Sequence, residues 1–220
     1  MAYNFDTIAR NYDRMNRVMT LGLDRRWRKR AVKGLQGNVL DVACGTGDMV
    51  VSLVKRGCTV TGVDLSEEML KIARQKTASA NSHFSILNFQ LCNAEALPFA
   101  DGEFDAVTCA FGIRNFEHLE IGLKAMARVM KVDGTMIIVE LSTPDSILIR
   151  PFYSLYSHHI IPLLGSCIAG NRAAYSYLPS SIERFPKGAE MLKIFESCGL
   201  HAKQQKLFFG VCRIYKCTKI

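Results

Sequence analysis

The stretch NVLDVACGTGD, from Asn38 to Asp48, combines residue types that form small-molecule sites. An apolar run reaches Asp41 and then opens into a turn that a second acid, Asp48, follows. The turn consists of Gly45, Thr46 and Gly47. Glycines let a ligand approach the main chain, and the helix expected to start at Asp48 offers unpaired N–H groups. We therefore expect this turn to hold a ligand.

The acids indicate which ligand the turn suits. A dinucleotide site carries a third glycine, in the pattern G-x-G-x-x-G, for close packing of the helix. Val50 stands in that place here, and Asp41 and Asp48 would repel a pyrophosphate but attract a cation. S-adenosylmethionine carries a sulfonium and an amino group. We therefore expect a site for this methyl donor.

Two further stretches are expected to complete the site. Asp64 ends the next strand-like run, where its carboxylate can accept hydrogen bonds from both ribose hydroxyls, and Leu65 follows it. Asn93, Ala94 and Glu95 follow the third strand-like run and can reach the adenine edge. Ligands of open parallel sheets bind beyond the carboxyl ends of the strands, where all these residues are expected to lie.

Strand-like and helix-like segments alternate along most of the chain, which predicts a mostly parallel sheet with helices on both faces. The expected strands are 39–43, 58–63, 83–91, 104–110 and 135–141, and the expected helices include 48–55, one that begins after Ser66, and 121–129. Two final strands, 202–207 and 211–217, have no helix between them and should pair antiparallel at the sheet edge. The predicted fold is α/β and Rossmann-like, with seven strands.

The whole chain, 1–220, is expected to form a single domain. Residues 1–35 are predicted to form a basic helical cap. Residues 142–186, rich in Tyr and Pro, are predicted to form a helical insert after the fifth strand. A structureless loop of that length is uncommon in a compact domain unless it is functional. We therefore expect the insert to cover the active site as a lid.

Bulk composition excludes several classes of protein. The first residues lack the pattern of a secretory signal, and the longest apolar stretch, 147–169, is interrupted by charged residues and prolines. We therefore expect a cytoplasmic protein. None of the eight cysteines has C-x-x-C spacing, which predicts reduced thiols in the core and no metal site.

The net charge of +8 is unevenly distributed. Residues 1–35 hold nine Lys/Arg against three Asp/Glu (+6), residues 40–145 hold nine against fourteen (−5), and residues 201–220 hold five against none (+5). Basic ends fit nucleic acid or anionic lipid head groups, and an ordinary solvated surface is an equal alternative.

Longer motifs resemble those of the ubiquinone/menaquinone biosynthesis C-methyltransferases over nearly the whole chain. The segment FDTIARNYDRMNRVMTLGLDRRWRK is similar to the family's N-terminal signature, and LDVACGTGD, NAEALPF, FGIRN and SYLPSSIERFP follow in the family's order. Three places depart from the family pattern. Val132-Asp133-Gly134 replaces a common Pro-Gly-Gly, Cys44 replaces a glycine, and Asp24 stands where a histidine is frequent.

The resemblance implies a class I S-adenosylmethionine-dependent methyltransferase that methylates a ring carbon of a polyprenylated quinol, in menaquinone or ubiquinone biosynthesis. The short N-terminus favours demethylmenaquinol. The implied cofactor contacts are Thr46, Asp64, Asn93, Ala94 and the backbone near Ala110. Apolar residues of the insert would suit a lipid tail, with core packing as the alternative. The basic ends would let the protein contact the inner face of the membrane peripherally. The sequence is compatible with a homodimer.

Ring methylation needs a group that stabilises a phenolate, because the ring carbon becomes nucleophilic when a neighbouring hydroxyl loses its proton. Arg114 of the FGIRN motif could hold the phenolate, or lower the pKa of the hydroxyl through a water. Asn115 could orient that water or the hydroxyl. A surface ion pair is the alternative for Arg114.

Several residues could act as the general base. Tyr12 and Asp13 lie in the N-terminal signature, and His158 and His159 lie in the insert. Histidine has the most suitable pKa for proton transfer near neutral pH. A structural role is the alternative for both histidines, and Asp13 could equally cap a helix.

Two other functions are compatible with parts of the sequence. Methylation of RNA is supported by the net charge, but the chain has no appended RNA-binding module and no N/D-P-P-F/Y motif, so no nucleic-acid partner is expected. A non-catalytic partner in a biosynthetic assembly would keep the fold without turnover. The intact Asp41, Gly45, Gly47 and Asp64 argue against that function.

Overall fold

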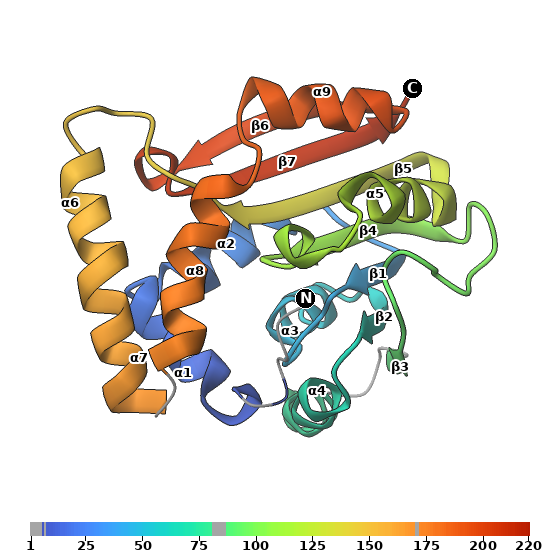
Figure 1. Ribbon diagram of the computed structural model, residues 1–220. Coiled ribbons are helices and arrows are strands. Elements are labelled where there is room, and N and C mark those ends of the chain that lie inside the picture. The colour runs from blue at the N-terminus through green and yellow to red at the C-terminus, as the bar shows by residue number, and fades with distance from the viewer. Residues whose placement is uncertain (1–5, 7, 81–86, 170–171) are drawn as a thin grey trace.

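The computed structural model describes residues 6, 8–80, 87–169 and 172–220, and its centre is a seven-stranded sheet (Figure 1). The strands are β1 (Asn38–Val42), β2 (Thr59–Asp64), β3 (Leu87–Leu91), β4 (Phe104–Ala110), β5 (Met130–Leu141), β6 (Leu200–Leu207) and β7 (Cys212–Lys219). Their order in the sheet is β3-β2-β1-β4-β5-β7-β6. The first five strands are parallel, which confirms the predicted Rossmann-like α/β fold.

Helices cover both faces of the sheet, and each face has its own buried apolar cluster (Figure 1). One face carries α2 (Leu23–Ala31), α3 (Asp48–Val54) and α4 (Glu67–Ala80), and the other carries α5 (Leu119–Val129) and α9 (Ala189–Ser197). Each helix turns an apolar side toward the strands. No helix in the described part of the chain is long and apolar enough to cross a membrane.

Most elements lie within a few residues of their predicted bounds. Ser66 caps α4 as expected, because its hydroxyl accepts the backbone N–H of Met69 at 3.1 Å. The fifth strand starts at Met130 rather than Thr135, since α5 runs directly into it. The third strand was expected from residue 83, but residues 81–86 lie outside the described part.

The last two strands pair antiparallel at the sheet edge, as predicted. β7 also pairs antiparallel with β5, so it lies between β5 and the edge strand β6. A short 3-10 turn, η4 (Phe208–Gly210), connects β6 to β7. Phe208 and Phe209 have positive φ angles of 44° and 56° in this turn, a conformation that residues with a Cβ rarely adopt.

The parallel register brings the predicted site residues to one edge of the sheet. Asp41 of β1 pairs with Gly62 of β2 and with Thr108 of β4. Val42, the last residue of β1, pairs with Val63 of β2. The segments that follow β1, β2 and β4 therefore emerge side by side.

The N-terminal cap is helical, as predicted, and consists of α1 (Ala9–Met19) and α2. Within the cap, Arg28 pairs with Asp24 at 2.5 Å, and both side chains are buried. Removing one partner of such a pair would leave an uncompensated buried charge, which typically costs about 3–5 kcal/mol. The pair therefore holds this part of the chain in one arrangement.

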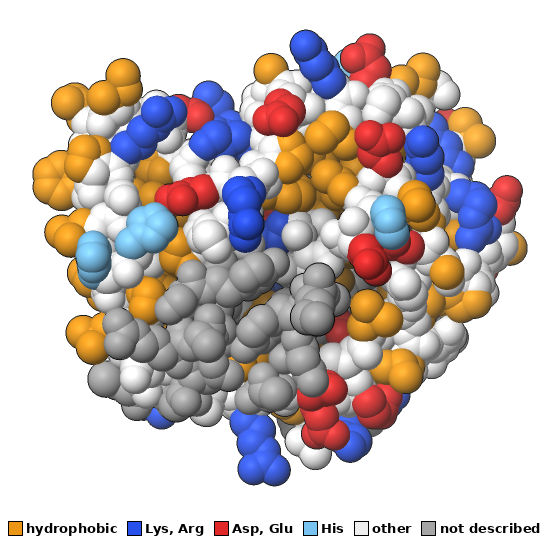
Figure 2. All heavy atoms as spheres, viewed as in Figure 1, with side chains coloured by type: hydrophobic (Ala, Val, Ile, Leu, Met, Phe, Trp, Pro, Cys, Tyr) orange, Lys and Arg blue, Asp and Glu red, His pale blue; other side chains and the backbone are white. Residues whose placement is uncertain are grey.

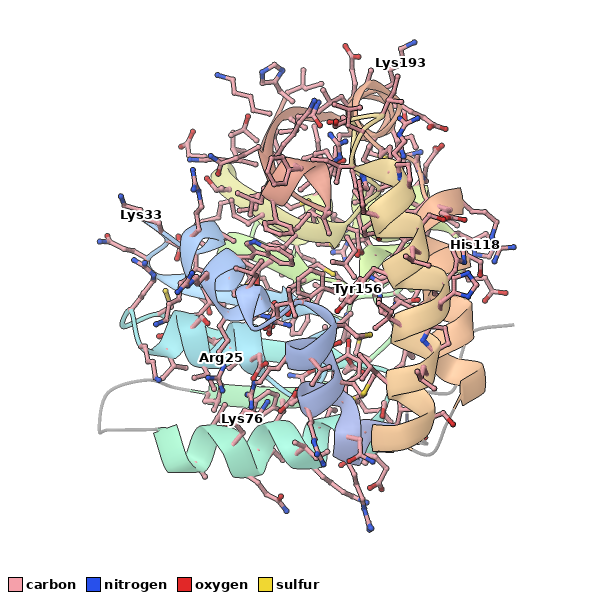
Figure 3. All side chains as sticks on the ribbon, turned by 90° about the vertical axis from the view of Figure 1, so that its left-hand side faces the viewer. Arg25, Lys33, Lys76, His118, Tyr156 and Lys193 are labelled. Carbon is pink, nitrogen blue, oxygen red and sulfur yellow. The ribbon has the colours of Figure 1, made fainter. Side chains whose placement is uncertain are left out.

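The insert after β5 is also helical, as predicted. It contains α6 (Arg150–Leu155), a π-helical turn η3 (Tyr156–Ile160), α7 (Ile161–Ala169) and α8 (Arg172–Arg184). Figure 3 shows α7 beside α1, and Tyr156 on the side of the insert that faces the cap. The Tyr156 hydroxyl donates to the carbonyls of Val18 and Met19, at 3.3 Å and 3.2 Å. The insert and the cap are thus packed against each other.

A buried arginine on β7 anchors the start of the insert. The guanidinium of Arg213 donates to Ser142 Oγ at 3.0 Å, to Gln204 Oε1 at 2.9 Å and to Asp145 at 2.5 Å. Ser142 and Asp145 lie in the segment that leads from β5 to α6. One side chain thus connects the sheet to the insert.

Substitution Arg213→Met should lower the free energy of unfolding by roughly 2–3 kcal/mol, because buried polar partners would lose their donor. Chemical denaturation measures this change. Lys216→Met, an exposed position on the same strand, is the matched control and should change stability by less than about 0.5 kcal/mol. Equal effects of the two substitutions would contradict the anchoring role of Arg213.

Candidate active site

A cavity of about 290 Å³ opens beyond the carboxyl ends of β1, β2 and β4, and we call it the cofactor cavity. Six of the nine residues predicted to contact the cofactor line it: Gly45, Asp64, Leu65, Asn93, Ala94 and Ala110. Glu95, in the same motif as Asn93 and Ala94, lines it too. These residues come from four separate segments, which the parallel register brings together.

Asp64 is held at the wall of the cofactor cavity by its backbone neighbours. Its two carboxylate oxygens accept the N–H groups of Gly45 at 2.8 Å and Ser66 at 2.9 Å. Burial raises the pKa of Asp64 above its ordinary value, and these N–H donors partly offset that effect. The carboxylate is therefore fixed in place, with remaining acceptor capacity for a ligand hydroxyl.

The two glycines of the turn have different roles. Gly45 has a φ angle of 54°, and a Cβ there would meet only Tyr12, at 4.0 Å, so this glycine keeps the cavity wall clear. Gly47 has a φ angle of 81°, and a Cβ there would lie 3.1 Å from the Ala73 side chain of α4. Gly47 thus allows the turn to pack against α4 and does not line the cavity, contrary to the prediction that it contacts the ligand.

Asp41 lies behind the cavity wall and does not line it. One of its oxygens accepts the Thr108 hydroxyl at 2.6 Å, and the other is buried without a hydrogen-bond partner among the described residues. Burial raises the pKa of Asp41 to about 7, although Thr108 and Arg28 act in the opposite direction. This unpartnered oxygen has capacity for one further hydrogen bond behind the cavity wall.

Thr46 and Asp13 do not line either cavity described here, although both were predicted as site residues. The Thr46 hydroxyl donates to Asp13 at 2.5 Å, and Lys76 pairs with Asp13 at 2.5 Å and with Asp48 at 2.7 Å. Figure 3 shows Lys76 on α4, close to α1. These polar side chains fasten the cap to the glycine turn. The charge of Asp48 is thus neutralised by the protein, and the prediction that it attracts the ligand is not supported by its position.

A second, mostly apolar cavity of about 300 Å³ lies between the cap and the insert, and we call it the apolar cavity. The cap contributes side chains that include Ile8, Met19, Leu23 and Trp27, and the insert contributes Phe152, Tyr153, Tyr156, Ile161, Leu178 and Ile182. Few polar groups interrupt this lining. The insert therefore forms one wall of the apolar cavity, and its role as a lid stays a prediction.

Among the described residues, three line both cavities: Tyr12, Phe111 and Asn115. We call them the window. Tyr12 comes from α1, whereas Phe111 and Asn115 follow β4. Phe111 has a φ angle of 61°, and such strain in a residue with a large side chain is found mostly at functional sites. The window is the place where a group bound in one cavity can meet a group bound in the other.

Arg114 lines the apolar cavity beside the window. Its guanidinium forms an ion pair with Glu140 of β5 and donates to the Phe111 carbonyl at 2.9 Å. Its Nε is buried without a partner among the described residues. Burial raises the pKa of Glu140, and Arg114 partly offsets that effect. Glu140 was not predicted, although an acid at the end of the apolar run MIIVEL is an unusual signal.

Arg28 connects the cap to the window. Besides its pair with Asp24, its guanidinium lies 3.8 Å from Asp48 and stacks over the Phe111 ring at 4.9 Å from the ring centre. Asp24 also lines the apolar cavity. Burial raises the pKa of Tyr12 above its ordinary value, although Arg114 acts in the opposite direction. Tyr12 therefore remains protonated at neutral pH.

His158 does not line the apolar cavity or the cofactor cavity. Its imidazole Nε2 lies 2.8 Å from Glu183 of α8, and the side chain is exposed. His159 is exposed as well. The structure therefore does not bring either histidine to the place where proton transfer is expected.

Comparisons with known proteins agree with this geometry. The model of the ubiE/COQ5 methyltransferase family matches residues 2–219. The chain belongs to this family. It is 39% identical to a demethylmenaquinone methyltransferase of Bacteroides fragilis, over 98% of this chain and 90% of that protein. It is also 39% identical to a ubiquinone/menaquinone biosynthesis C-methyltransferase of Geotalea daltonii, over 96% of this chain and 92% of that protein.

Solved structures support the methyltransferase fold. An S-adenosylmethionine-dependent methyltransferase of Thermotoga maritima has a TM-score of 0.66 to this chain, with 19% sequence identity over 98% of each chain. The methyl donor of this protein is S-adenosylmethionine. The residues present fit it, because Asp64 and Asn93 line the cofactor cavity with hydrogen-bonding groups and Asp64 has acceptor capacity left for ribose hydroxyls.

The pKa of Asp41 predicts a pH-dependent stability. A carboxyl whose pKa rises from 3.8 to about 7 on folding stabilises the protein below the lower value, and this contribution is lost as the pH rises through the higher one. The loss should reach at most about 1.4 kcal/mol per pH unit. Asp41→Asn should remove this pH-dependent loss of stability. Chemical denaturation of the wild type and the variant, between the two pKa values, measures the difference.

Asp133→Asn, at an exposed position, is the control for the general loss of one negative charge. The difference in unfolding free energy between Asp41→Asn and the wild type should change in favour of the variant as the pH rises. A difference that stays constant with pH would contradict a raised pKa for Asp41.

Proposed function

We propose that this methyltransferase transfers a methyl group to a ring carbon of a polyprenylated quinol, with demethylmenaquinol as the preferred substrate. The observation that carries the proposal is the window, since it joins a polar cavity suited to the methyl donor with an apolar cavity suited to a lipid quinol. The names of the relatives support the ring chemistry. The apolar lining favours this substrate over RNA, whose phosphates require cationic side chains.

S-adenosylmethionine supplies the reaction with a methyl group on a positively charged sulfur. The chain's own part begins with orientation, because Phe111 and Asn115 fix the edge of the quinol ring at the window. Holding two reactants in line can supply a large part of the rate acceleration. The apolar walls also keep bulk water away from the polyprenyl tail.

Arg114 has the charge needed to stabilise the phenolate form of the quinol. It lies beside the window. Its buried Nε–H has no hydrogen-bond acceptor among the described residues. A positive charge next to a ring hydroxyl lowers the pKa of that hydroxyl, so its proton can leave to water at neutral pH. The electron pair left on the oxygen increases the nucleophilicity of the ring carbon. As this carbon forms its bond to the methyl group, the C–S bond of the donor would break, and the ring carbon would then lose its own hydrogen as a proton, which restores the aromatic quinol.

Glu140 and Tyr12 support this step in different ways. Glu140 positions Arg114 through their ion pair. Tyr12, whose pKa is raised by burial, stays protonated at the window and is not used as a base. Asp13 and His158 do not act as the base, because Asp13 is paired with Lys76 and His158 with Glu183.

The cellular setting is part of the proposal. We infer a cytoplasmic protein that contacts the inner face of the membrane peripherally, because its substrate carries a polyprenyl tail that partitions into lipid. The tail would leave the apolar cavity at its mouth, where Leu21, Phe152 and Phe208 lie.

The experiment that tests the proposed function is mass spectrometry of the quinones in a bacterial strain that lacks its own quinone C-methyltransferase and carries this gene. Restored menaquinone is the expected result. Restored ubiquinone alone would change the ring assigned to the substrate. Quinones that stay demethylated, with the protein folded and expressed, would contradict the proposal.

Substitutions of Arg114 and of its ion-pair partner Glu140 test the mechanism. Arg114→Ala should lower kcat/KM for a quinol substrate by roughly 100-fold, since it removes a charge that stabilises the transition state. Glu140→Gln should lower kcat/KM less, because Arg114 keeps its charge but loses its orientation. Steady-state kinetics and calorimetric binding of S-adenosylmethionine measure these effects, and cofactor affinity should stay unchanged.

Arg128→Ala is the matched control, because Arg128 pairs with the exposed Asp101, donates to the carbonyls of Leu97 and Phe99, and lines neither cavity. Its kcat/KM should equal that of the wild type. An Arg114→Ala variant with wild-type kinetics would remove Arg114 from the mechanism.

A further inference from the structure

Exposed apolar side chains surround the mouth of the apolar cavity. Six of them have exposed fractions above one half: Leu21 (73%), Ile147 (79%), Leu148 (81%), Phe152 (74%), Phe208 (52%) and Phe209 (65%). We call these six residues the apolar rim. Leu21, Phe152 and Phe208 also line the cavity, so the outer surface of the rim continues into the inner wall. Large exposed apolar patches on a protein usually mark a contact surface.

The rim is built from segments that are distant in the sequence but adjacent in space. The backbone N–H of Asp145 donates to the Phe209 carbonyl at 3.4 Å, which joins the segment before α6 to the turn after β6. Figure 1 shows both segments at the same corner of the molecule, next to the upper end of α6. Figure 2 shows hydrophobic side chains along this side of the surface, with Lys and Arg side chains near them.

The backbone of the rim is strained in a way that presents large side chains outward. Leu21, Phe208 and Phe209 have φ angles of 52°, 44° and 56°. A residue with a Cβ pays of order 1 kcal/mol for this conformation, and glycine would avoid the strain. Leucine and phenylalanine at such positions, with more than half of each side chain exposed to water, gain little stability from burial. This combination indicates a functional surface.

The charges beside the rim are positive. Arg150 begins α6 two residues after Leu148, and Lys206 precedes Phe208 by two residues; both are exposed. The nearby acid, Asp145, is already paired with Lys206 at 2.7 Å and with Arg213 at 2.5 Å. Apolar side chains flanked by cations match the interface of an anionic lipid bilayer, with its apolar chains and negative head groups.

We propose that the apolar rim inserts into the surface of an anionic bilayer and opens the apolar cavity directly to the lipid. The inference rests on the proposed function, because a polyprenylated quinol could then enter the cavity from the membrane without crossing water. Insertion places the six rim side chains among the acyl chains near the head groups. Arg150 and Lys206 then lie at head-group level.

Flotation of the full-length protein with vesicles tests the proposal without any substrate. Vesicles of phosphatidylcholine with phosphatidylglycerol are compared with vesicles of phosphatidylcholine alone. The double variant Ile147→Ser/Leu148→Ser should lower the partition coefficient roughly tenfold or more, given the apolar area that it removes from lipid contact. The control Ile121→Ser/Val132→Ser removes exposed apolar side chains elsewhere (50% and 77% exposed) and should bind like the wild type.

A second measurement locates the inserted surface. Leu148→Trp should be quenched by brominated lipids, whereas Val132→Trp should not, and the native Trp27 is buried. Three results would overturn the proposal: no flotation of the wild type, equal loss of binding in the rim and control variants, or no quenching of Leu148→Trp. A wild-type dimer that Ile147→Ser/Leu148→Ser converts to a monomer without vesicles would assign the rim to a second copy of the chain instead.

Failure of this proposal can be distinguished from failure of the proposed function. Ile147 and Leu148 line neither cavity, so their double variant should methylate a short-tailed, water-soluble quinol as the wild type does. A wild type that binds vesicles but methylates no quinol would contradict the proposed function and would still support insertion of the apolar rim. A wild type that methylates the soluble quinol but does not bind vesicles would contradict the rim alone.

Discussion

The guanidinium of Arg28 is the group on which the arrangement of the two cavities depends. It pairs with Asp24 inside the cap, approaches Asp48 at the start of α3 and stacks over Phe111 at the window. A buried charge is stable only when its partners surround it closely. The cap, the glycine turn and the segment after β4 must therefore adopt one relative position, and the window forms where they meet. Lys76 makes a second connection between the cap and the turn through Asp13 and Asp48.

This arrangement separates two chemical environments that ring methylation requires. The cofactor cavity offers fixed hydrogen-bond acceptors, such as Asp64, and the buried acid Asp41 lies behind its wall. The apolar cavity is lined mostly by hydrophobic side chains, and Arg114, beside the window, is its one cationic residue among those described. Low polarity around Arg114 strengthens its effect on a phenolate, since little water screens it. The same buried charge requires Glu140, which explains why a buried acid follows the apolar run near the end of β5.

Much of this fold and part of the site could be predicted from the sequence. Alternating apolar runs and glycine turns indicate the parallel sheet, and the residues after each strand indicate the cofactor cavity, because strand ends must meet at one edge. Side-chain direction could not be predicted in the same way. Thr46 and Gly47 belong to the glycine turn, yet the turn directs them toward Asp13 and Ala73. Glu140 and Phe111 gain their roles from contacts between distant segments, and local sequence carries no direct signal for such contacts.

The most direct test of the central claim uses purified protein, S-adenosylmethionine with a deuterated methyl group, and a polyprenylated demethylmenaquinol kept reduced. Mass spectrometry with fragmentation then locates the label. The two-cavity arrangement predicts a deuterated methyl group on the ring carbon, with none on either quinol oxygen. A label found on oxygen, or no labelled quinol while the protein still binds S-adenosylmethionine, would contradict transfer through the window to the ring.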